Sequence, residues 1–249
     1  MATIAGSAVL VTGGNRGIGR ALVEEALRRG ATRVYAGTRG PMAHPDRRVT
    51  PLILDVTSAA QTREAADRVG SLDLLVNNAG VAVSDDLSDR AAIERHLAVN
   101  LFGTYGVTRA FLPMLTRSRG AIVNNLSLNA LAPLPVTPAY AISKAAAFSL
   151  TQGLRALLAG RGVRVHAVLI GPVDTDMNQG AGLREVLADT PMASAESVAL
   201  AIFDGVENEE EYIFPDPMSA AMADGWRSGA VKAFEHQLAA LAEAEPARQ

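Results

Sequence analysis

The sequence of 249 residues contains no cysteine. The chain therefore forms no disulfide bond, and it offers neither a thiolate ligand for a metal nor a cysteine nucleophile. Histidine is scarce as well. The four histidines are far apart in the sequence and none forms an HxxxH pair: His44, His96, His166 and His236. We therefore expect a protein without a metal site.

An excess of one charge and long apolar runs are also missing. The 23 basic and 26 acidic residues leave a formal net charge of −3 and form no basic block, which argues against a nucleic-acid partner. No apolar run approaches the roughly 20 residues that span a bilayer. Residues 1–14 lack the basic start and the long apolar stretch of a signal peptide. We expect a soluble cytoplasmic protein that binds no membrane.

Short β-rich runs alternate with longer helical patterns. The β-rich runs predict strands over residues 7–13, 33–38, 49–56, 72–80, 120–127, 163–171 and 209–215, and the helical patterns cover residues 16–30, 91–118 and 138–160. Strands separated by helices indicate βαβ units and a parallel sheet, and nearly all-apolar strands fit a sheet covered on both faces. The sequence therefore predicts an α/β fold: a single-domain, Rossmann-type, doubly wound parallel sheet of about seven strands, flanked by helices on both faces.

A glycine-rich loop connects the first predicted strand to the first predicted helix. Gly13, Gly17 and Gly19 have the spacing GxxxGxG. Such glycines allow a tight turn, a close approach of the backbone to a pyrophosphate and close packing of helix on strand. The helix N-terminus then presents unpaired N–H groups to the phosphates. Turns alone would also favour glycine, but the place of this loop at the start of a βαβ array predicts a dinucleotide site.

The end of the strand over residues 33–38 indicates which dinucleotide binds. NAD-binding proteins usually carry an acidic residue there, which holds the ribose 2′-hydroxyl. Here Thr38 and Arg39 take that place, and Arg16 lies in the glycine loop. Two guanidinium groups match the oxygens of a 2′-phosphate, whereas two solvated surface arginines are the alternative. We predict a preference for NADPH over NADH.

Tyr140 and Lys144 are four residues apart in a predicted helix and therefore share a face. A free tyrosine has a pKa of about 10 and is a poor acid or base near neutrality. A nearby ammonium favours the phenolate, lowers this pKa and so suits the tyrosine for general acid–base catalysis. The alternative is a snorkelling lysine beside a core tyrosine.

Two further polar residues fit the same site. Ser127 ends a predicted strand and Tyr140 begins the next helix, so both fall at the carboxyl edge of the sheet, where open α/β folds bind ligands. The Ser127 hydroxyl could then hold a carbonyl oxygen beside Tyr140. Asn100 is a mediocre helix former within an apolar helical stretch. It either binds a water that links Lys144 to solvent or satisfies neighbouring backbone groups.

These residues together resemble the short-chain dehydrogenase/reductase family. The matching motifs, in the family's order, are TGGNRGIG at 12–19, LDV at 54–56, NNAG at 77–80, VN at 99–100, Ser127, YAISK at 140–144 and GPVDTDM at 171–177. The resemblance covers residues 5–177 motif by motif. One departure is Ile170, which precedes Gly171 where family members commonly have proline.

The resemblance implies a role for each matching position. Asn100, Ser127, Tyr140 and Lys144 match the catalytic tetrad. Tyr140 would donate the proton in reduction, and Ser127 would orient the carbonyl. Lys144 would lower the Tyr140 pKa and bind the nicotinamide ribose, and Asn100 would hold a relay water. Contacts to NADPH or NADP+ are implied at Gly13, Asn15, Arg16, Gly17, Ile18, Gly19, Thr38, Arg39, Asp55, Val56, Asn78, Ala79, Gly80, Tyr140, Lys144, Val173 and Thr175.

The resemblance implies an NADP-dependent carbonyl reductase or ketoreductase, reversible as an alcohol dehydrogenase. A mostly aliphatic and uncharged pocket wall predicts a neutral ketone or aldehyde as substrate: Leu128, Asn129, Leu131, Leu134, Val136 and the segment 176–197. One alternative is a non-catalytic NADP(H)-binding regulatory or sensor protein, and another is an NAD-linked alcohol dehydrogenase of the same fold. A third is a sugar-nucleotide epimerase or dehydratase, for whose extra substrate domain the chain looks too short.

We expect one domain over residues 1–249. Residues 1–80 would mainly bind the dinucleotide, and residues 81–175 would hold the tetrad and the second half of the sheet. Residues 176–197 contain glycines and prolines that break the pattern, so this segment is a candidate substrate lid. Residues 198–249 would form the C-terminal helix, strand and tail.

The helix predicted over residues 140–158 is apolar on most sides, so it must be buried. One side would cover the sheet, and another would meet a second subunit unless the helix lies entirely in the core. Together with the resemblance, this pattern predicts a homodimer or homotetramer.

Overall fold

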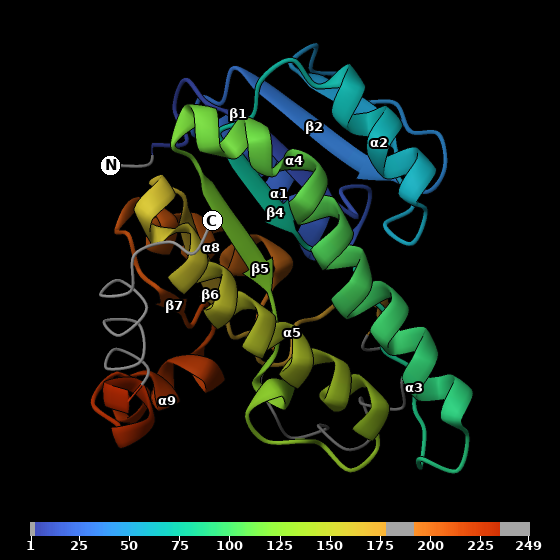
Figure 1. The fold of residues 1–249 in the computed structure, drawn as a ribbon, viewed down its shortest axis with the longest axis vertical. Helices are drawn as coiled ribbons and strands as arrows, with labels where there is room; N and C mark the ends of the chain where they lie inside the picture. Colours follow the sequence, from blue (N-terminus) through green and yellow to red (C-terminus); the bar gives the residue numbers. More distant parts are fainter. Residues whose placement is uncertain (1–2, 178–191, 235–249) are drawn as a thin grey trace, which may run out of the picture.

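The computed structural model of the protein describes residues 3–177 and 192–234. These residues form a seven-stranded sheet in the order β3-β2-β1-β4-β5-β6-β7, in which every neighbouring pair is parallel (Figure 1). The strands are β1 (Ala8–Thr12), β2 (Arg33–Thr38), β3 (Val49–Ile53), β4 (Leu74–Asn77), β5 (Ala121–Asn125), β6 (Arg164–Val168) and β7 (Tyr212–Ile213). The order reverses between β1 and β4, so the predicted doubly wound parallel sheet is confirmed.

Helices cover both faces of the sheet, as predicted (Figure 1). Alternate residues of a strand point to opposite faces. Val9 and Val11 of β1 belong to the apolar cluster under α1 (Gly17–Arg28) and α8 (Ala195–Glu207). Leu10 belongs to the cluster on the other face. That cluster is covered by α2 (Ala59–Arg68), α4 (Thr104–Ser118) and the end of α5 (Pro138–Leu158).

The smaller elements lie around the carboxyl edge or at helix ends. They are α3 (Arg90–Leu97), η1 (Ala98–Gly103), η2 (Leu128–Ala130), η3 (Ala159–Arg161) and α9 (Pro217–Arg227). No helix lies between β2 and β3, in agreement with the short predicted connection over residues 39–48. β3 contains Pro51, which an edge strand tolerates because one side of it needs no partner.

The single helix predicted over residues 91–118 is wrong in one respect, because the structure divides it into α3, η1 and α4. The middle segment η1 is π-helical. The wider turn there lets the Asn100 side chain leave the helix and bond the backbone of Val81. Gly103 ends the segment, and a Cβ at this position would lie 2.7 Å from Val56 Cγ2. Apolar periodicity does not reveal such a turn, since it depends on contacts with other elements.

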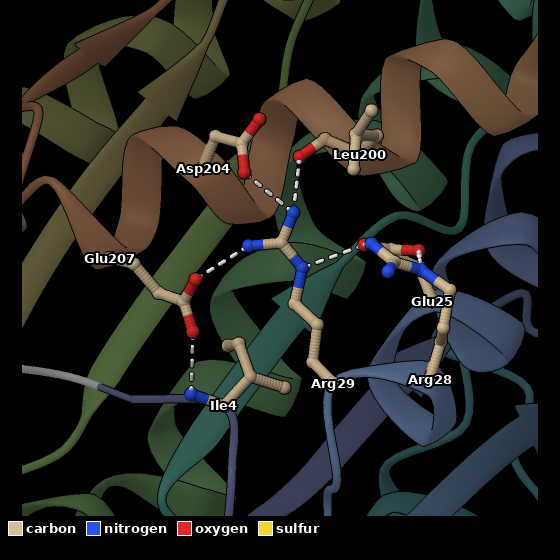
Figure 2. Close-up of polar contacts among 7 residues, drawn as sticks. All are labelled: Ile4, Glu25, Arg28, Arg29, Leu200, Asp204 and Glu207. Carbon is tan, nitrogen blue, oxygen red and sulfur yellow. Dashed lines mark hydrogen bonds and ion pairs between the residues drawn. The ribbon is translucent and has the colours of Figure 1, made fainter.

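A cluster of charged side chains joins α1 to α8 (Figure 2). Arg29 follows α1 directly, and its guanidinium donates to Glu25 at 2.7 Å, to Glu207 at 2.6 Å and to Asp204 at 2.6 Å. A fourth bond reaches the Leu200 carbonyl oxygen at 3.0 Å. These bonds fix α8 against the helix that begins at the glycine loop.

Candidate active site

A cavity of about 500 Å³ opens at the carboxyl ends of the strands, beside the point where the strand order reverses. This is the place where open α/β sheets bind ligands. It brings together every predicted cofactor position: Gly13, Asn15, Arg16, Gly17, Ile18, Gly19, Thr38, Arg39, Asp55, Val56, Asn78, Ala79, Gly80, Tyr140, Lys144, Val173 and Thr175. Of the four predicted tetrad residues, Ser127, Tyr140 and Lys144 also line the cavity, whereas Asn100 does not.

The glycine loop forms a cradle that has no space for side chains at its glycine positions. A Cβ at Gly19 would lie 2.0 Å from the Gly13 carbonyl oxygen. Gly13 and Gly17 have φ values of +68° and +51°, which favour glycine. Arg16 precedes α1 and makes no side-chain cap, so the first N–H groups of the helix have no partner from it. The loop therefore fits the phosphates of a dinucleotide.

Thr12 holds the glycine loop against the end of β4, a function that sequence reasoning missed. Its hydroxyl oxygen accepts hydrogen bonds from the backbone N–H groups of Asn78 and Ala79, at 2.9 and 3.0 Å. Asn78 Nδ2 donates to the Thr12 carbonyl oxygen at 2.9 Å, and Asn125 Nδ2 donates to Asn78 Oδ1 at 2.9 Å. The only local signal was a threonine that ends an apolar strand.

Two arginines and two carboxylates lie at the β2 end of the cavity. Arg39 lines this end, and Arg16 Nη1 is 3.7 Å from Asp176 Oδ2 in an exposed ion pair. Thr38 instead turns its hydroxyl to the Gly40 carbonyl oxygen, at 2.5 Å. The pKa of Asp55 is lowered by hydrogen bonds from the hydroxyl and backbone of Thr57 and by the charge of Arg39.

Ser127, Tyr140 and Lys144 form the polar centre of the site. A hydrogen bond joins the Ser127 and Tyr140 side chains. Lys144 is 6% exposed, its Nζ donates to the Asn125 carbonyl oxygen at 2.8 Å, and it lies 5.6 Å from the centroid of the Tyr140 ring. The predicted i, i+4 juxtaposition is therefore present.

The expected lowering of the Tyr140 pKa by Lys144 is wrong for this structure. Burial raises the pKa of Tyr140 to about 12, and the Ser127 hydrogen bond offsets only part of this. Burial also lowers the pKa of Lys144 to about 8. Desolvation is the main cause of both shifts, because burial disfavours the charged form of each group.

Asn100 lies behind the cavity wall. Its Oδ1 accepts from Val81 N at 2.9 Å, while its Nδ2 donates to the Val81 carbonyl oxygen and to Ser143 Oγ, each at 2.9 Å. Asn100 therefore satisfies the backbone groups of Val81, as one of the two interpretations expected, and its relay water stays a prediction. A Cβ at Gly80 would lie 3.2 Å from Asn100 Oδ1 and 3.8 Å from Lys144 Nζ, so this glycine lets the loop after β4 approach both.

The N-terminus of α5, which carries Tyr140, is capped from another part of the chain. Thr137 at the cap position makes no side-chain cap. Asp85 Oδ2, in the loop after β4, accepts from Ala139 N at 3.2 Å. His96 Nε2 accepts from Val83 N at 3.1 Å, and its ring meets the Tyr140 ring edge-on at 6.3 Å. Sequence reasoning missed Asp85 and His96 because their contacts are long-range.

The cavity wall near Tyr140 is mostly apolar. It includes Leu128, Asn129, Leu134, Ile170, Met177 and Met218. The prediction was wrong for Leu131, which packs into a separate apolar cluster, and for Val136, which does not line the cavity. Met218 was missed, since it comes from α9.

Most of the predicted lid, residues 178–191, lies outside the described residues. The residues that flank this segment are hydrogen-bonded to each other. Asp174 N donates to the Ala193 carbonyl oxygen at 3.0 Å, and Ala193 N donates to the Pro172 carbonyl oxygen at 3.2 Å. Both ends of the segment are therefore fixed beside the cavity.

The short chain dehydrogenase family model matches residues 7–185. The chain is 37% identical over 189 residues to 2-(S)-hydroxypropyl-CoM dehydrogenase 3 of Xanthobacter autotrophicus, which covers 69% of this chain and 73% of that protein. It is 36% identical over 187 residues to mouse estradiol 17-beta-dehydrogenase 2, which covers 68% of this chain but 49% of that protein. The chain thus spans about half the length of the mouse relative.

A solved structure is similar over nearly the whole chain. It is a short chain dehydrogenase from Burkholderia cenocepacia in complex with NADP, with a TM-score of 0.82 and 36% identity. The match covers 96% of this chain and 99% of the other. The protein belongs to the short chain dehydrogenase family, an oxidoreductase family that uses nicotinamide cofactors.

Proposed function

We propose that the protein is an NADPH-dependent oxidoreductase that interconverts a neutral ketone or aldehyde and the corresponding alcohol. One observation carries this proposal. The hydrogen-bonded pair of Ser127 and Tyr140, with Lys144 beside it, faces the same cavity as the glycine cradle. The similarity to a relative that binds NADP supports it.

Three side chains would orient the carbonyl group, donate the proton and stabilise the phenolate, while the bound cofactor would supply the hydride. In reduction, Tyr140 would transfer its phenolic proton to the oxygen of the carbonyl group whose carbon accepts the hydride. Ser127 donates a hydrogen bond to the same oxygen and holds it beside Tyr140. The Lys144 ammonium stabilises the phenolate that remains. Since Tyr140 has a raised pKa, it is protonated near neutrality, as a proton donor must be.

NADPH is the proposed cofactor because Arg16 and Arg39 stand at the β2 end of the cavity without a carboxylate at the end of that strand. Guanidinium groups match the oxygens of a 2′-phosphate. A fluorescence titration should give a lower Kd for NADPH than for NADH. Equal or tighter binding of NADH would contradict this assignment.

The substrate proposal follows from the apolar wall of Leu128, Leu134 and Met218. The test follows NADPH absorbance with a panel of neutral ketones and aldehydes and, as a control, anionic keto acids. We expect turnover of neutral carbonyls. A clear preference for keto acids would contradict the substrate class. Tight NADPH binding with no turnover of any compound would favour a sensor protein instead.

We also propose that the protein is a homodimer or homotetramer built on α4 and α5. Phe102, Tyr105 and Ile142 belong to η1, α4 and α5, and their side chains are 62%, 42% and 41% exposed. Large apolar side chains of this kind gain stability when a second subunit covers them. Light scattering should give at least twice the mass of the chain, and a monomeric mass would refute the proposal.

A further inference from the structure

Asp216 is a buried carboxylate outside the predicted site. It caps the N-terminus of α9 and is 5% exposed. Its Oδ1 accepts from Ser219 N at 3.0 Å, and its Oδ2 accepts from Ser219 Oγ at 2.7 Å. An N-cap needs only one acceptor oxygen, so the second oxygen is available for another element.

That second oxygen reaches the loop after β6. Asp216 Oδ2 accepts from Gly171 N at 2.7 Å. A Cβ at position 171 would lie 2.5 Å from Asp216 Oδ1, so this close approach requires glycine. Gly171 begins a segment that lines the cavity through Gly171, Pro172, Val173 and Thr175. The carboxylate therefore holds the start of a cavity wall.

The same helix supplies another part of the wall. Met218, two residues after Asp216, lines the cavity. At the other end of α9, the Trp226 ring packs 5.5 Å from Tyr212 and 5.7 Å from Phe148. With α9 anchored at Trp226, the Asp216 contact fixes the loop after β6 and Met218 relative to each other.

Leu128, directly after Ser127, donates its N–H to the Ile170 carbonyl oxygen at 2.9 Å, so the loop after β6 begins beside the residues that would bind the reacting carbonyl. We propose that Asp216 is a positioning residue that sets this loop, from Gly171 onward, for the nicotinamide end of the cofactor. This inference rests on the proposed function. It predicts a selective effect, because Arg39 and Asp55 at the other end of the cavity follow β2 and β3, and Asp216 touches neither. Arg16 does reach the end of the segment, through an exposed ion pair with Asp176. Loss of the contact should disturb the nicotinamide and leave the adenosine end unchanged.

The test compares two Asp→Ser variants. Asp216→Ser keeps a good N-cap hydroxyl but removes the second oxygen, which reaches Gly171. Asp89→Ser is the matched control, because Asp89 caps α3 with a bond to Ala91 N at 2.8 Å and lies away from the cavity. Calorimetry measures binding of NADPH and of 2′-phospho-ADP-ribose, which lacks nicotinamide, and steady-state kinetics gives kcat.

For Asp216→Ser we expect NADPH binding to weaken by about tenfold, as fits the loss of a hydrogen bond to a charged group. We expect 2′-phospho-ADP-ribose to bind as in the wild-type protein, kcat to fall, and Asp89→Ser to change none of these. Equal weakening of both ligands would show a merely structural role and overturn the proposal. Unchanged NADPH binding would overturn it too.

Ser219→Ala decides the question if Asp216→Ser does not fold. This variant removes one donor to the carboxylate and keeps the helix. It should weaken NADPH binding by a smaller factor and spare the fragment, and unchanged NADPH binding would overturn the proposal. Both readouts are binding constants, so they hold even if the wild-type protein turns over no carbonyl. If the protein prefers NADH, the same comparison uses NADH and ADP-ribose.

Discussion

Arg29, which is partly buried, and Lys144, which is buried, lie on opposite faces of the sheet, and their surroundings differ. Arg29, between α1 and α8, bonds three carboxylates (Figure 2). Burial opposes its charge, but the bonds to Glu25 and Asp204 outweigh burial and raise its pKa. Lys144, on α5, has a backbone carbonyl as its partner, and burial lowers its pKa to about 8.

The difference separates the charge of Arg29, which stabilises the fold, from that of Lys144, for which we propose a role in catalysis. A cation surrounded by carboxylates stays charged at every pH at which the protein is folded, so it holds elements together. A buried cation without a carboxylate titrates near neutrality, as groups that take part in proton transfer do. The four predictions that follow test this contrast, from the largest expected effect to the smallest.

Lys144→Met should lower kcat for carbonyl reduction by roughly a hundredfold or more, since the ammonium no longer stabilises the Tyr140 phenolate. Its free energy of unfolding should change little, because the variant also removes a desolvated charge. Steady-state kinetics and urea unfolding measure both effects. Lys232→Met, at the only other lysine in the sequence, is the control and should keep wild-type turnover. A stable and fully active Lys144→Met variant would contradict the catalytic role of Lys144.

Arg29→Met should show the reverse pattern, with a loss of stability and little change in kcat. Because Arg29 is only partly buried and Asp204 and Glu207 reach water, we expect a loss of roughly 1–3 kcal/mol, the range for hydrogen bonds to charged groups. Urea unfolding measures the change. Arg28→Met is the matched control, because Arg28 pairs with Glu25 from the surface and its replacement should change stability much less than that of Arg29. Equal effects of the two variants would contradict the structural role.

His166 is another buried group whose pKa is shifted by burial. Burial lowers its pKa from 6.5 to about 4. The unfolded chain therefore binds more protons between these values, and stability falls as pH drops from about 6.5 towards 4. His166→Asn keeps a donor for the Glu210 carbonyl oxygen. Between pH 7 and pH 4.5, the free energy of unfolding of this variant should fall by about 2 kcal/mol less than that of the wild-type protein. Urea unfolding at both pH values measures it, and an unchanged acid loss would count against the assignment.

The pH dependence of reduction should follow Lys144 rather than Arg29. Because the folded-state pKa of Lys144 is about 8, kcat/KM for reduction should fall to about half its plateau near pH 8 and decline further above it. Stability should move the other way and rise between pH 8 and 10, where the unfolded chain still holds the proton. A flat rate profile up to pH 10 would contradict the Lys144 assignment.

The parallel sheet and the position of the site were predictable because both follow from local patterns. Apolar strands, the glycine spacing and the i, i+4 pair of Tyr140 and Lys144 are all visible in short stretches of sequence. The residues that support the site were not predictable, since Thr12, Asp85 and Asp216 act on elements far away in the sequence. Burial was equally hidden, so the direction of the Tyr140 pKa shift was predicted wrongly.

Tyr140→Phe tests the proposed chemistry most directly. The variant removes one hydroxyl and the hydrogen bond to Ser127 but keeps the ring beside His96. We predict that kcat for reduction of a neutral carbonyl falls by roughly a hundredfold or more, while the Kd for NADPH stays at the wild-type value. Wild-type turnover by the phenylalanine variant would contradict Tyr140 as the proton donor.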